Sequence, residues 1–185
     1  MTWISAVPSV DGFLWARKLF PTNNVRGVCA AFSQTWLTLS LIGGAPVKNP
    51  GILRSPGQIQ AIHQGRPRVG AQPSSTPLGS SSLVTLPESG LKIQTGYPKL
   101  PYSTNWKDIY AYLASQPDGH YYLTIKSPFR HAMACIILGS EVYYLEPQKG
   151  LYVIPKAKTS DSLTAFYSQY TWSSGNDYKI YQVGT

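Results

Sequence analysis

The chain has 185 residues, of which 43% are hydrophobic, so it is long and apolar enough to bury a core and is not a disordered chain. Its net charge is +8, yet only 13% of its residues are charged, and the excess reflects a shortage of acids more than a basic tract. A nucleic-acid module would normally show a denser basic stripe, so nucleic-acid binding is not expected as the main function. No segment approaches eighteen consecutive apolar residues, so no membrane-spanning helix is expected.

Cysteine and histidine are few. Cys29 and Cys135 allow one disulfide at most, and the three histidines lie far apart without any metal-ligand spacing. We therefore expect no metal site and no cofactor. The segment from Met1 to Phe20 lacks the charged start and apolar run of a signal peptide. This favours a protein that stays in the cytosol or is exported without a cleaved signal, unless the chain is a domain cut from a longer protein.

The first clear element is a long apolar run from Cys29 to Ile42, which Gly43 and Gly44 end. Phe32, Trp36 and Leu39 recur at three- and four-residue spacing, which predicts a buried helix that begins at Cys29. Residues 55–65 resemble a short helix with Ser55 as its cap and Pro56 at its first position. Residues 66–82 are rich in Pro, Ser and Gly, which predicts an exposed, mobile loop that borders a cleft or a partner surface.

The second half predicts a helix from Thr104 to Pro117, four strands, a last helix from about Ser160 to Tyr170, and a final strand over residues 178–183. Because turns link the four strands closely, neighbours should be antiparallel. Helices that precede a twisted antiparallel sheet predict an α+β fold, with residues 1–185 as one domain. The four strands are expected at residues 120–125, 131–138, 142–145 and 151–154.

Cys29 is a candidate nucleophile. A cysteine at a helix N-terminus is exposed to free backbone N–H groups and a positive dipole end, and both favour the reactive thiolate. Gly27 would allow the chain to turn sharply into the helix. The alternative is a buried structural cysteine, which is what we expect of Cys135 inside the apolar run Met133 to Leu138.

His131 is a candidate general base at the start of a strand in which Ala132, Ala134 and Ile136 alternate. The two alanines are small enough for a helix to pack closely. Glu146 ends the next strand, so its carboxylate could orient the imidazole if the paired strands bring both residues to the same end of the sheet. The alternatives are a surface histidine and a turn glutamate.

Asn23 and Asn24 precede Cys29 by six and five residues. A side-chain amide at either position could donate to the oxyanion that forms when a carbonyl is attacked. The alternative is a pair of ordinary turn asparagines.

These residues together resemble the YopT/AvrPphB group of papain-like cysteine proteases, which are bacterial effectors delivered into other cells. The first matching segment is Asn23-Asn24-x-x-Gly27-x-Cys29-Ala-Ala-x-Ser33-x-x-Trp36-Leu37. The second is Gly119-x-Tyr-Tyr-Leu-x-Ile, then His131-Ala-x-Ala, then Tyr144-Leu-Glu-Pro-x-x-Gly150. The resemblance covers residues 23–42 and 119–154, and this sequence has Glu146 where the group has Asp.

The resemblance implies a papain-like fold, with the nucleophile helix packed on the sheet, and covalent acyl transfer by Cys29, His131 and Glu146. It implies a secreted bacterial effector or toxin that cleaves a protein in the cytoplasm of a target cell, with a cognate immunity protein in the producer if the target is a competitor bacterium. The same residues would serve a deamidase or a peptidoglycan amidase. A catalytically silent binding or adaptor domain of the same fold is the alternative from another class.

Overall fold

The structure is a computed structural model of the chain. It describes residues 2–6, 29–49, 89–94, 106–125, 131–147, 149–167 and 179–185. Within these ranges only the backbone is described for residues 2–6, 29, 31, 106, 107, 125, 131 and 167.

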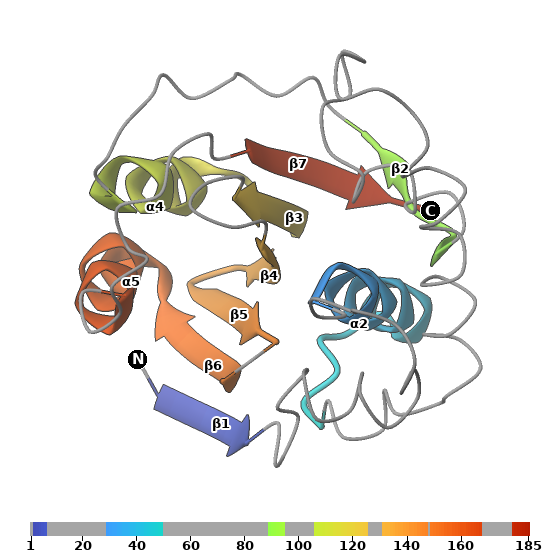
Figure 1. The fold of residues 1–185 in the computed structure, drawn as a ribbon, viewed down its shortest axis with the longest axis horizontal. Coiled ribbons are helices and arrows are strands. Elements are labelled where there is room, and N and C mark those ends of the chain that lie inside the picture. Colours follow the sequence, from blue (N-terminus) through green and yellow to red (C-terminus); the bar gives the residue numbers. More distant parts are fainter. Residues whose placement is uncertain are drawn as a thin grey trace, which may run out of the picture.

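One antiparallel sheet of seven strands organises the described residues, in the order β1-β6-β5-β4-β3-β7-β2 (Figure 1). The four central strands are consecutive along the chain, so they form a meander of hairpins. The chain also adds a strand at each side of the meander, β1 on β6 and β7 on β3. The strands are β1 (Thr2–Ala6), β2 (Lys92–Ile93), β3 (Gly119–Ile125), β4 (His131–Leu138), β5 (Glu141–Glu146), β6 (Gly150–Pro155) and β7 (Lys179–Gly184).

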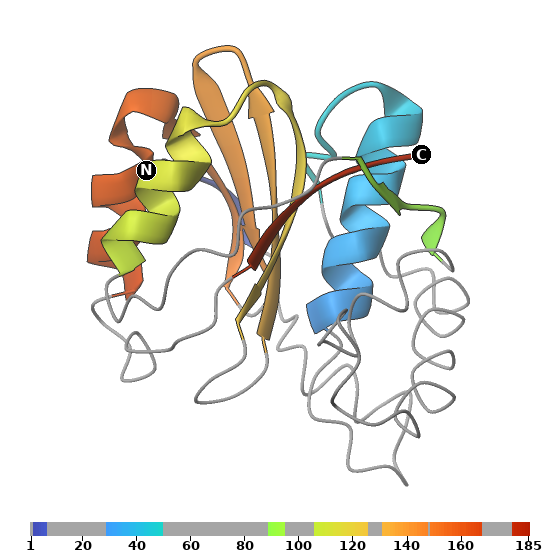
Figure 2. The ribbon, with the colours of Figure 1, turned by 90° about the horizontal axis from the view of Figure 1, so that it is seen from above.

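Helix α2 (Cys29–Gly43) covers one face of the sheet, and α4 (Trp106–Ser115) and α5 (Thr159–Tyr167) lie together on the other, as Figure 2 shows. The short 3-10 helix η3 (Lys156–Lys158) leads from β6 into α5. Three layers result, with an apolar core on each side of the sheet. The alternation of side chains along each strand decides which residues enter which core.

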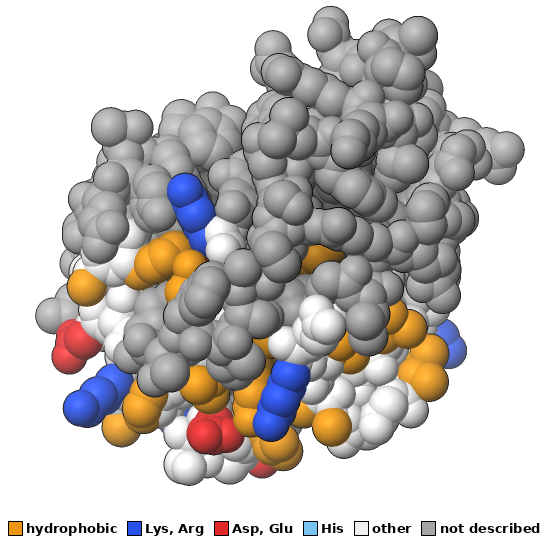
Figure 3. All heavy atoms as spheres, turned by 90° about the horizontal axis from the view of Figure 1, so that it is seen from below, with side chains coloured by type: hydrophobic (Ala, Val, Ile, Leu, Met, Phe, Trp, Pro, Cys, Tyr) orange, Lys and Arg blue, Asp and Glu red, His pale blue; other side chains and the backbone are white. Residues whose placement is uncertain are grey.

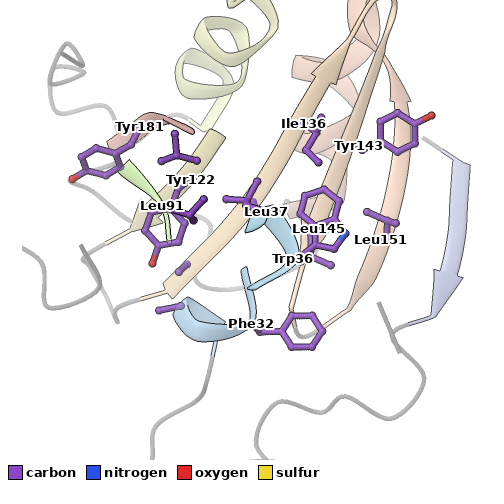
Figure 4. Packing of buried hydrophobic residues seen from close by; sticks show 14 residues of the cluster. Phe32, Trp36, Leu37, Leu91, Tyr122, Ile136, Tyr143, Leu145, Leu151 and Tyr181 are labelled. Atoms are coloured by element: carbon purple, nitrogen blue, oxygen red, sulfur yellow. The ribbon is translucent and has the colours of Figure 1, made fainter. Parts of the chain in front are cut away.

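The core under α2 is aromatic and aliphatic (Figure 4). Phe32 and Trp36 of α2 are buried against Leu145 of β5, and the small residues Ala132 and Ala134 of β4 leave room for the helix. The Trp36 indole N–H donates to the Val47 carbonyl oxygen at 2.8 Å, so its polar atom is satisfied inside the core.

The core on the other face joins α4 and α5 to the alternate residues of the same strands. Met133, Cys135 and Ile137 of β4 point to this side, where they meet Tyr110 of α4 and Leu163 of α5. Burial of both faces explains the almost continuous apolar sequence of β4.

The predicted fold class is confirmed: the protein is α+β, and the helix that begins at Cys29 packs on a sheet that is antiparallel throughout. The four predicted central strands and the helices near residues 106–115 and 159–167 are present. The sequence did not predict β1 or β2. The predicted helix at residues 55–65 and the loop at residues 66–82 lie outside the described residues.

Candidate active site

Cys29 is the first residue of α2, as predicted. The first turns of an α-helix leave backbone N–H groups without intrahelical partners, so this position offers a positive electrostatic environment. The helix continues through an apolar sequence to Gly43, and Gly44 follows with φ of +68°, a conformation that favours glycine. The side chain of Cys29 is outside what the structure describes.

His131 is the first residue of β4 and pairs with Ile125, the last residue of β3. The next residue, Ala132, is buried under α2 together with Ala134. The predicted close approach of a helix to these alanines is therefore confirmed. The side chain of His131, like that of Cys29, is not described.

A hydrogen bond connects the two elements near their first residues. The Ser33 hydroxyl of α2 donates to the carbonyl oxygen of Ala132 at 3.4 Å, and both residues are buried. Ser33 follows Cys29 by four residues, which is about one helical turn or 6 Å along the axis. The backbones of Cys29 and His131 thus start from the same end of the α2–β4 contact. Sequence reasoning gave Ser33 no role, although its four-residue spacing from Cys29 placed it on the same helix face.

Glu146 is the last residue of β5, and its side chain is fully buried. The β4–β5 register pairs Ala134 with Leu145, and its continuation by one residue sets Glu146 opposite Met133. Positions 131 and 146 therefore belong to the same face of the sheet and are diagonal neighbours. This face carries α4 and α5, whereas α2 covers the opposite face.

A tight turn holds Glu146 at this end of the sheet. The backbone N–H of Lys149 donates to the Glu146 carbonyl oxygen at 2.9 Å, and Glu146 pairs with Gly150 across the turn. Gly150 has φ of +144°, which favours glycine. A buried carboxylate is costly unless it is hydrogen-bonded or paired, and Glu146 does interact with a partner.

Asn23 and Asn24 lie outside the described residues. Cys135 forms no disulfide and is completely buried in the core between β4 and helices α4 and α5, so the prediction of a core residue is confirmed. Burial raises the pKa of the Cys135 thiol, and the neutral thiol is a poor nucleophile.

The described residues contain no cluster of three or more His, Cys, Asp or Glu side chains that could hold a metal ion. Among the helices that the structure describes, none is long and apolar enough to cross a membrane. On the face in Figure 3, the coloured basic side chains lie apart from one another. The described part of this face thus shows no dense basic stripe.

Neither a known protein family nor a curated protein matches the sequence. The architecture is nevertheless an established one, the α+β papain-like fold. The solved structure of the Pseudomonas avirulence protein AvrPphB is similar to this chain, with a TM-score of 0.67 and 17% sequence identity. The similarity covers 91% of this chain and 95% of the solved AvrPphB chain. At this identity the likeness shows the fold.

Proposed function

We propose that this chain is a cysteine endopeptidase that cleaves a protein substrate, with Cys29 as nucleophile, His131 as general base and Glu146 as the group that orients His131. The proposal rests on the contact from the Ser33 hydroxyl to the Ala132 carbonyl oxygen, which brings the first turns of α2 close to the start of β4. We further propose that residues 1–185 form one papain-like domain.

The positions of the three residues support the proposal. Cys29 and His131 each occupy the first position of an element, so side chains there can meet beyond the ends of the elements. Helix α2 and Glu146 belong to opposite faces of the sheet. The His131 imidazole can therefore contact both Cys29 and Glu146 only if it lies at the end of β4, where the two faces meet. The likeness to AvrPphB, from the protease group that the sequence resembles, supports the same arrangement.

The proposed reaction has two stages. The His131 imidazole takes the Cys29 thiol proton, and the thiolate attacks the peptide carbonyl carbon, so that a C–S bond forms and the carbonyl π-bond opens to an oxyanion. The oxyanion would accept hydrogen bonds from the Cys29 backbone N–H and from Asn23 or Asn24. The imidazolium then gives its proton to the leaving amine as the C–N bond breaks. Water, deprotonated by His131, cleaves the thioester and restores the thiol.

Glu146 would hold the imidazole in the tautomer and orientation that this proton transfer needs. A fully buried carboxylate at a diagonal position can do so without competing water. The side chain is one methylene longer than the aspartate of the resembled group.

We propose a bacterial effector or toxin as the biological setting, exported by a specialised system and active on a protein in the cytoplasm of a target cell. The likeness to an avirulence protein supports this setting. An antibacterial version would need a cognate immunity protein in the producing cell.

The proposal can be tested by exposing cell extracts to the wild-type protein and to Cys29→Ala, and then identifying new protein N-termini by mass spectrometry. The Cys135→Ala variant is the matched control, because it removes a cysteine from the core instead of the helix start. We expect cleavage products with wild type and Cys135→Ala and none with Cys29→Ala. Equal product patterns from all three proteins would contradict the proposal.

A further inference from the structure

Three residues form a row across the sheet at the level of the candidate site. Thr124 of β3 pairs with Ala132 of β4 on one side and with Lys179 of β7 on the other. Directly paired residues of an antiparallel sheet point to the same face, and Ala132 points toward α2. Thr124 and Lys179 thus belong to the α2 face, at the end of the sheet where α2 begins.

Helix α2 packs mainly against β4 and β3, so Lys179 on β7 flanks the helix instead of lying beneath it. Two strand spacings separate Lys179 from Ala132, which is about 10 Å. Because strand side chains stand roughly perpendicular to the sheet, the Lys179 side chain rises from the sheet beside α2. The Ala132 carbonyl accepts a hydrogen bond from Ser33, one turn after Cys29, so Lys179 belongs to the row of the sheet on which the first turns of α2 pack.

The chemistry of Lys179 fits the binding of an anion. Thr124 is buried and Lys179 is half-buried, so part of the lysine remains accessible. In the ranges that the structure covers, no carboxylate is seen to pair with Lys179. By contrast, the Lys156 ammonium is held by the Gln116 carbonyl oxygen at 2.7 Å.

We infer that Lys179, supported by Thr124, forms a substrate subsite that binds an acidic side chain near the scissile bond. The inference rests on the proposed protease function, because it assigns a specificity to that same site. A lysine ammonium stabilises a carboxylate by charge and hydrogen bonding, more strongly when partly removed from water. The substrate class is therefore a protein with Asp or Glu close to the cleaved bond.

The first test needs no substrate and measures the electrostatic effect of Lys179 at Cys29. Iodoacetate and iodoacetamide alkylate the same thiolate, but only iodoacetate is negatively charged. The rate ratio is the rate of Cys29 alkylation by iodoacetate divided by the rate with iodoacetamide, measured by peptide mass spectrometry at low ionic strength. Compared with wild type, this ratio should be about three- to tenfold lower in Lys179→Glu and should fall less in Lys179→Met. Lys158→Glu is the matched control, because exposed Lys158 follows the far end of β6 and should leave the ratio unchanged.

The outcomes separate this inference from the proposed function. A reactive Cys29 whose rate ratio is the same in wild type and Lys179→Glu would overturn the subsite alone. A folded protein in which Cys29 reacts with neither reagent would contradict the proposed function, and the subsite with it. The expected result is a lower ratio in Lys179→Glu than in wild type, and high salt should remove this difference between the two proteins.

The second test measures specificity with a defined library of peptides from a digested proteome. Wild type and Lys158→Glu should cleave peptides enriched in Asp or Glu at one fixed position from the cleaved bond. In Lys179→Glu the preference for acidic over basic residues there should fall about tenfold or invert. Wild-type cleavage without an acidic preference, or an unchanged preference in Lys179→Glu, would overturn the inference.

Discussion

The Ser33 hydroxyl donates to the Ala132 carbonyl oxygen at 3.4 Å, and this contact links the helix that begins with Cys29 to the strand that begins with His131. The surrounding contacts between α2 and β4 are apolar, so they hold the helix on the strand but leave it freer to slide. The Ser33–Ala132 contact is long for an O–H···O hydrogen bond, but its direction favours one register of the two elements.

Ser33→Ala should reduce kcat/KM about tenfold and destabilise the fold by about 1 kcal/mol, because the helix start loses its fixed distance from β4. Activity on a peptide substrate and urea unfolding measure the two effects. Ser40→Ala is the control: Ser40 is also buried in α2 and accepts a hydrogen bond from the Val47 N–H at 3.1 Å, but lies farther from Cys29. Similar stability losses with similar activity losses in both variants would contradict a positioning role for Ser33.

His131→Gln should shift the alkylation of Cys29 to higher pH. With an imidazolium nearby, the thiolate persists below the ordinary thiol pKa of about 8.5, whereas without it the rate should follow a pKa closer to that value. The measurement is the rate of iodoacetamide labelling at Cys29 from pH 5 to 10. His120→Gln serves as control, since His120 lies at the opposite end of β3 from the strand end that pairs with His131. An unchanged profile in His131→Gln would remove His131 from the mechanism.

Glu146→Ala should lower turnover strongly but incompletely, while Cys29→Ala abolishes it, because the orienting group contributes less than the nucleophile. Glu146→Asp should retain much of the activity, and Glu146→Gln tests the charge at nearly constant shape. Single-turnover rates on a peptide substrate distinguish the variants. Glu141→Gln at the exposed opposite end of β5 is the control. Full activity in all three folded Glu146 variants would leave Glu146 as a turn residue only.

Cys135→Ala should keep full activity and lower the free energy of unfolding by about 1–2 kcal/mol, because it leaves a small cavity in the core. In the native wild-type protein, Cys135 should resist alkylation, since burial excludes reagent and raises the pKa of the thiol. Denaturant unfolding and peptide mass spectrometry check the two statements. Loss of turnover in a folded Cys135→Ala variant would mean that the nucleophile has been wrongly assigned.

His120 should make the protein less stable in acid. Burial lowers the pKa of His120 from 6.5, so the unfolded chain binds its proton more readily than the folded chain. This contribution to stability is complete above pH 6.5 and is lost as the pH falls through the lowered pKa. The decrease in Tm between pH 7.5 and pH 5 should therefore be smaller in His120→Gln, and an equal decrease in both proteins would contradict the expectation.

The central strands could be predicted because each has an apolar run bounded by its own turn residues, as at Gly139 and Ser140 between β4 and β5. The outer strands could not. Strand β2 has only two residues, and β1 pairs with β6, so that Thr2 lies opposite Val153 from the other end of the sequence. No local pattern identifies a pairing whose partner is so distant.

For the candidate site, the sequence predicted which residues begin the helix and the strand, because the apolar periods start at Cys29 and His131. It also predicted that Glu146 ends the next strand. It could not predict that Glu146 and α2 belong to opposite faces of the sheet, or that Lys179 shares a row with Ala132, since both relations depend on strand register. The assigned catalytic roles stay predictions.

The position of β7 has a consequence for the synthesis of the protein. This strand lies inside the sheet, between β3 and β2, although it is formed by residues 179–184. During synthesis the hairpins of residues 119–155 can pair before residues 179–184 are available, and until then β3 has an open edge. An open strand edge can pair with another chain, so the protein is prone to aggregation until β7 pairs with β3.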